Sequence, residues 1–172
     1  MINKKQINQI LTFLLTLSFI LWLGIYISRL LITYQLFEPV DLSLKKIFIN
    51  YDLNPIFYSF YPLIVSSLVL YLALLILFIF YLVTTERKVK ENGWLLIITL
   101  IIFITSPFEL YLCYKDLKLI NTILEIPKVN FNEILSLVKE RLIILNNFSL
   151  IEIFSYFIIA YLVIYKPLQK RQ

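Results

Sequence analysis

One stretch decides the fold: residues 56–83 read IFYSFYPLIVSSLVLYLALLILFIFYLV, 28 residues without a charged side chain. A helix needs about 20 such residues to cross a hydrocarbon core roughly 30 Å thick. Pro62 is tolerated at the first position of a helix. We therefore expect the regular membrane helix over 63–83, with 54–61 as its approach at the interface.

Three further apolar stretches lie on either side, at 10–28, 94–114 and 150–165. The last is short, so local thinning of the bilayer or interfacial anchoring has to make up the difference. Backbone groups inside a bilayer must be satisfied within the segment, which favours helices. The sequence predicts an all-α integral membrane protein with four transmembrane helices, forming a single membrane domain over 1–172.

The composition supports this class of protein and excludes several others. Hydrophobic residues make up 60% of the 172 residues and charged ones only 16%, against about 25% in soluble domains. There is no His, and Cys113 is the only Cys, which excludes imidazole ligands and a disulfide within the chain. The sequence shows no glycine-rich phosphate loop, no paired carboxylates and no nucleophile beside a base. We therefore predict no enzyme, no cofactor and no metal site.

The basic residues indicate the orientation by their density. With both termini in the cytoplasm, eight Lys or Arg would lie inside and eight outside. The inner eight are concentrated in three short segments directly beside the membrane stretches, where the positive-inside bias acts most strongly. We predict a multi-pass protein of the cell (inner) membrane with both termini cytoplasmic. Its formal charge of +5 would face anionic lipid head groups and not nucleic acid.

Two segments then lie outside the membrane. In the first, 33–54, we expect a short interfacial helix over 41–50, with a strand as the alternative. In the second, 115–149, apolar residues recur at steps of three and four, which is typical of amphipathic helices. One such helix would extend the third crossing as far as Ile126 and stop at Pro127. Asn130 or Asn132 would cap the other, whose opposite face would carry Arg141.

The two amphipathic stretches predict a helical hairpin outside the membrane. Their apolar seams could instead lie flat on lipid, and in either arrangement they could dock on another protein. This candidate partner seam consists of Leu117, Ile120, Leu124, Ile134, Val138 and Leu142.

Glu109 is the only acid well inside a membrane stretch, about 22 Å along a helix from Trp94. Ionisable residues there are costly and are functional candidates. It shares a side of the helix with Thr99, Ser106 and Cys113. We favour an ion pair with Arg29 at the outer interface over a functional role in a wet cleft near Pro107.

Ser149 and Glu152 precede the last apolar run with the spacing of a capping box, in which each side chain satisfies a backbone N–H of the other residue. This pattern gives Glu152 a structural role at the start of the fourth membrane helix.

The segment Gly93-Trp94-Leu95-Leu96, with Ser106-Pro107 towards the far end of the same stretch, resembles a family of uncharacterised small bacterial four-helix membrane proteins. The resemblance covers about 20 residues and implies a bacterial membrane protein without a known activity.

The leading functional hypothesis is a protein that acts by binding, as an accessory or structural subunit of a larger membrane complex. Its partners would be the lipid bilayer and another membrane protein or further copies of itself. The alternative is a self-assembling pore or small transporter that uses Glu109 on the weakly polar face.

Overall fold

Five α-helices make up most of the chain in the computed structural model, which describes residues 4–49, 51–85, 89, 92–124, 131–145 and 148–168. They are α1 (Lys4–Leu36), α2 (Asn54–Thr84), α3 (Gly93–Leu124), α4 (Phe131–Leu145) and α5 (Phe148–Tyr165). These described ranges contain no β-strand, so the predicted all-α class is confirmed.

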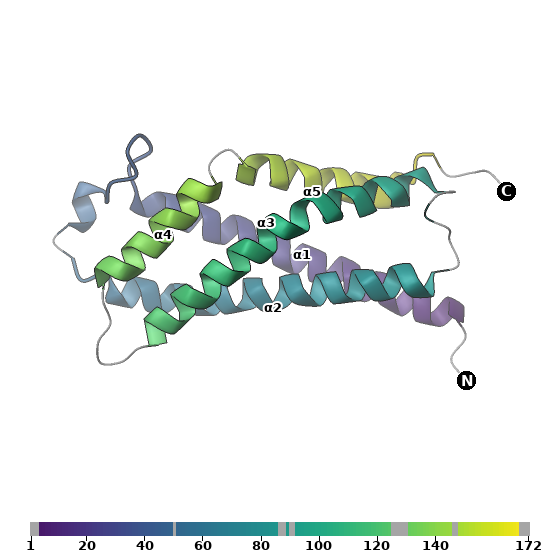
Figure 1. Cartoon of the computed structure of the whole chain (residues 1–172), viewed down its shortest axis with the longest axis horizontal. Helices are drawn as coiled ribbons and strands as arrows, with labels where there is room; N and C mark the ends of the chain where they lie inside the picture. Colours follow the sequence, from purple (N-terminus) through teal and green to yellow (C-terminus); the bar gives the residue numbers. More distant parts are fainter. Residues whose placement is uncertain are drawn as a thin grey trace.

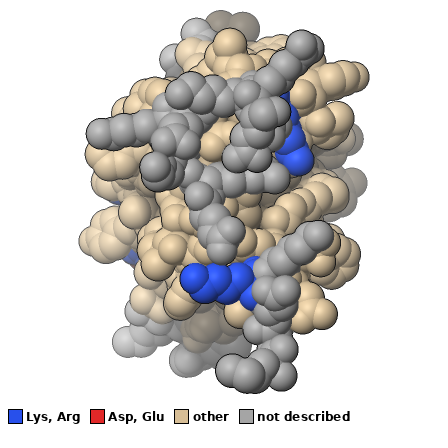
Figure 2. Space-filling view, turned by 90° about the vertical axis from the view of Figure 1, so that its right-hand side faces the viewer, with Lys and Arg blue, Asp and Glu red and all other residues tan. Residues whose placement is uncertain are grey.

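The four long apolar helices run along the same axis, and α4 lies beside α2 and α3 at one end (Figure 1). We call this end, with residues 37–49 and α4, the outer end. The opposite or inner end holds the start of α1 and the end of α5, so both termini lie there. Figure 2 faces the inner end and shows basic but no acidic side chains among the described residues in view.

Four helices are long and apolar enough to cross a membrane: Gln6–Leu36, Pro55–Thr84, Gly93–Leu124 and Phe148–Tyr165. Each contains or overlaps one predicted stretch. The second begins earlier than predicted, because Pro55 takes the position in the first turn that we assigned to Pro62. Pro62 lies inside α2, where neighbouring helices can satisfy the backbone group that it frees.

Two apolar cores fill the bundle. The inner core surrounds Trp22, Tyr71 and Trp94, with Ile98 and Leu162 in the same cluster. Trp22 is completely buried, with the rings of Tyr71 and Tyr156 at 5.3 and 4.8 Å. The inner half of the bundle is therefore closed by large side chains.

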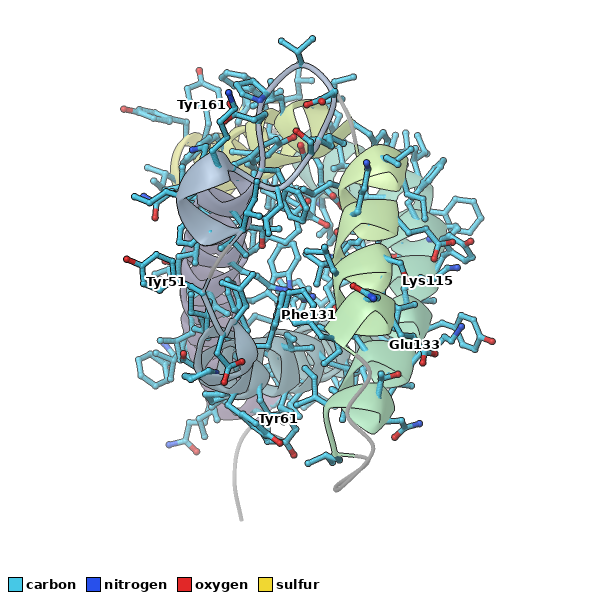
Figure 3. All side chains as sticks on the ribbon, turned by 90° about the vertical axis from the view of Figure 1, so that its left-hand side faces the viewer. Tyr51, Tyr61, Lys115, Phe131, Glu133 and Tyr161 are labelled. Carbon is cyan, nitrogen blue, oxygen red and sulfur yellow. The ribbon has the colours of Figure 1, made fainter. Side chains whose placement is uncertain are left out.

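The outer core joins α4 to the ends of α1, α2 and α3, with Leu36, Phe57, Leu119, Ile134 and Leu142 among its members. The rings of Phe57 and Phe131 are 5.7 Å apart, and Figure 3 shows Phe131 directed inwards from α4. The helix α4 thus covers the outer end instead of standing apart from it.

The first outer segment contains much less helix than we predicted for 41–50. Only one turn of 3-10 helix forms, η1 (Lys46–Phe48), and an isolated bridge joins Phe37 to Leu44. Leu42 has a φ of 52°, a left-handed conformation that an α-helix cannot include. A turn therefore replaces the first half of the expected helix, and residue 50 lies outside the described residues.

The second outer segment differs from the prediction in its buried face. Helix α4 packs on α3, with Ile134 and Leu142 buried and Val138 half-buried. On α3, however, Leu119 and Ile123 face inwards, whereas Leu117 and Leu124 are exposed and Ile120 is half-buried. Two adjacent apolar stripes run along this helix, one facing the bundle and one facing away from it, and the predicted seam follows the stripe that faces away.

Helix α3 is described as far as Leu124 and α4 begins at Phe131, so Ile126, Pro127 and Asn130 lie outside the described residues. Asn132 lies inside α4.

A buried ionic cluster as the candidate functional site

Charged residues from four helices meet between the two cores, and two arginines share one aspartate at the centre. Arg29 of α1 donates from Nη1 to Oδ2 of Asp116 at 2.7 Å and from Nη2 to Oδ1. Nη1 of Arg141 lies 2.6 Å from Oδ1 of Asp116 and donates to the carbonyl of Leu112 at 3.2 Å. The side chains of all three charged residues are at most 10% exposed.

This geometry corrects two expectations. Arg29 pairs with Asp116 and not with Glu109, because Asp116 lies two helical turns further along the same face of α3 and reaches the level of Arg29. Arg141 lies inside, not on the opposite face of α4. Burial by itself would lower the pKa of the Arg141 guanidinium. The charges of Asp116 and Glu109 outweigh that effect and raise its pKa above the ordinary value.

A pair of carboxyl groups lies beside the arginines. Glu109 of α3 and Glu152 of α5 are 2% and 0% exposed, and the two carboxyl groups interact with each other electrostatically. The Oε1 atom of Glu109 is buried and has no hydrogen-bond partner among the described residues. The structure thus contains paired carboxylates, which the sequence did not lead us to expect.

Hydroxyl groups surround Glu152. Tyr26 donates to its Oε2 at 3.1 Å and Tyr156 to its Oε1 at 3.4 Å. The hydroxyl groups of Tyr156 and Thr105 are 3.3 Å apart. Helix α5 begins at Phe148, so Ser149 lies inside the helix and not at the N-cap position of the predicted capping box. Glu152 instead belongs to the interior of the bundle.

The predicted weakly polar face of α3 contributes less to this site. The hydroxyl groups of Thr99 and Ser106 donate to carbonyl groups one turn back in their own helix, at 2.8 and 2.6 Å. Cys113 is buried beside the cluster. The residue that sequence reasoning missed is Asp116, although its seven-residue spacing from Glu109 could have placed both on one face.

A small cavity adjoins the arginines at the outer side of the cluster. It has a volume of about 30 Å³ and is lined by Tyr26, Arg29, Thr33 and Arg141, with Phe57 and Leu119 among the apolar residues. A water molecule needs on the order of 10–15 Å³ of such volume. The cavity can therefore hold about two waters and is too small for a cofactor.

Among the described residues, no group of three or more acidic, Cys or His side chains is arranged to hold a metal ion. Comparisons with protein families, with curated proteins and with solved structures give no match. The functional argument therefore depends on the geometry of this chain.

Proposed function

We propose that the chain is a multi-pass protein of the cell membrane, with both termini cytoplasmic, and that it acts by binding. Its role would be that of an accessory or structural subunit of a larger membrane complex. The observation that carries the proposal is an apolar surface on the part of the bundle that would project beyond the bilayer.

The shortest membrane helix supports an estimate of where the bilayer ends. Helix α5 has 18 residues and is about 27 Å long, close to the thickness of the hydrocarbon core. Its first residue, Phe148, stacks on Phe108 of α3 at 4.6 Å. The part of α3 after Phe108 would therefore extend about 24 Å further, together with α4.

On α2, the large exposed aliphatic side chains run from Val69 to Val83, consistent with the same boundary. The earlier part of α2 instead presents Tyr58 and Ser59, which suit an interface.

The projecting part carries large apolar side chains that internal packing does not use. Leu117 and Leu124 on α3 are 49% and 52% exposed, and Ile143 on α4 is 57% exposed. Removing apolar surface from water is favourable, so these side chains favour contact with a partner. Leu117 and Leu124 are the exposed members of the predicted partner seam.

The alternative of a pore or transporter has less support. Glu109 is buried within its own chain, so it would not line a channel between copies. Towards the inner end, the cluster is followed by the large apolar side chains of the inner core. A conduction path normally requires polar residues or broken helices near the midplane.

The test is purification from the native source in a mild detergent, followed by mass spectrometry. We expect a stoichiometric membrane partner with the wild-type chain and its loss with the double variant Leu117→Ser and Leu124→Ser. Ile47→Ser is the control, because Ile47 is equally apolar and 68% exposed but lies outside the seam. Recovery of a homo-oligomer alone, with an ion flux in liposomes that Glu109→Gln abolishes, would overturn the proposal.

A further inference from the structure

We propose that Glu109 and Glu152 form a proton-binding site, in which one proton is shared between the two carboxyl groups at neutral pH. This inference goes beyond a binding role for the chain and is independent of any partner. It is carried by the full burial of two carboxyl groups, one of which has an oxygen atom without a hydrogen-bond partner, and by the charge balance of their surroundings.

The burial of two interacting carboxyl groups requires a proton. An ionised carboxylate has only acceptor atoms, so two neighbouring carboxylates repel each other unless one of them is protonated. Both side chains are at least 98% buried. Water is therefore not available in bulk to weaken that repulsion.

The charges around the pair also indicate that the two carboxyl groups hold one proton. The groups that face it are Tyr26 and Arg29 from α1, Tyr71 from α2, Cys113 and Asp116 from α3, Arg141 from α4 and Tyr156 from α5. With the tyrosines and the thiol neutral, two guanidinium groups face three carboxyl groups. One shared proton leaves two positive and two negative charges, and uncompensated buried charge is costly.

Access to the site is from the outer end. Tyr26 lines the cavity beside the arginines, and its hydroxyl group donates to Glu152. Tyr26 therefore lies between the water-sized cavity and the carboxyl pair. On the inner side of the carboxyl pair lies the apolar inner core, which includes Trp22. We therefore expect the proton to exchange with the outer aqueous phase.

The experiment is infrared spectroscopy of the full chain in lipid nanodiscs at pH 7. A protonated carboxyl group absorbs apart from ionised ones, and its band shifts in D₂O. We expect the wild-type chain to show this band at the intensity of one group per chain. We expect Glu109→Gln and Glu152→Gln each to lose it, because two remaining carboxylates balance the two arginines without a proton.

Glu133→Gln is the matched control, because Glu133 lies on the exposed face of α4, and it should leave the band unchanged. A wild-type chain without the band would overturn the proposal whatever the variants do. So would a band that survives in both Gln variants or disappears with Glu133→Gln, since the proton would then reside elsewhere.

Discussion

Replacing Asp116 with Asn tests whether the ionic cluster holds the outer end together. Asn keeps the size of the side chain but removes the negative charge that Arg29 and Arg141 contact at 2.5–2.7 Å. Both guanidinium groups stay buried, and breaking a buried pair by removing one partner costs about 3–5 kcal/mol. We expect a loss of this size in the free energy of unfolding. It is measured by titrating SDS into mild-detergent micelles while circular dichroism follows helix content.

Two further variants make this prediction specific. Glu140→Gln breaks the pair between Lys115 and Glu140 at 2.6 Å, in which the Glu140 side chain is 45% exposed. This surface pair should contribute little. Combining Asp116→Asn with Arg141→Gln removes one of the two guanidinium groups that lose their partner. The loss in the free energy of unfolding of the double variant should therefore be smaller than the sum of the two single losses, by about 0.5–3 kcal/mol. An ordinary surface substitution changes the free energy of unfolding by up to about 0.5 kcal/mol. If Asp116→Asn changes it by no more than that, the reasoning is wrong.

Three other predictions concern packing, a turn and the orientation. Leu119→Ala should lower the free energy of unfolding by about 2–5 kcal/mol and Leu117→Ala by less than about 0.5 kcal/mol, because only Leu119 is buried; equal losses would contradict the assigned face of α3. The backbone N–H and the hydroxyl group of Ser43 donate to Asp41 and hold its pKa below the ordinary value. This stabilisation of the turn is therefore present above the unfolded pKa and is lost as the pH falls through the folded pKa. Ser43→Ala should raise the pKa of Asp41 in a carbon-13 NMR titration, and an unchanged value would refute the assignment. Alkaline phosphatase inserted into 37–49 in a bacterial host should be active and the same enzyme fused after 168 inactive, whereas the reverse pattern would invert the sidedness.

The helices and their apolar character follow from local sequence. The second membrane stretch could be recognised because 28 uncharged residues have few stable arrangements other than a membrane helix. Its start could not, because Pro55 and Pro62 are both compatible with a first turn, and the sequence alone does not decide between them. The same holds for Leu117 and Leu119, which lie on neighbouring stripes of one helix.

The cluster was only partly predictable. Glu109 stood out as an acid in an apolar stretch, whereas Asp116 lies among charged residues that resemble an ordinary surface. Its burial depends on Arg141, which lies 25 residues later on a different helix, and no periodicity links the two. Long-range pairing of this kind is a property of the tertiary structure, so a single sequence gives no signal for it.

The order in which the chain is synthesised has a consequence for the Arg29–Asp116 pair. The two residues are 87 positions apart, and Tyr26 is 126 positions from Glu152. At about 5–20 residues per second, Arg29 leaves the ribosome roughly 4–17 s before the aspartate that neutralises it. During that interval the nascent first helix carries an uncompensated cation at its outer end, where lipid phosphates or an insertion factor must accommodate it. Arg29 therefore waits for its ionic partner during a large part of the synthesis of the chain.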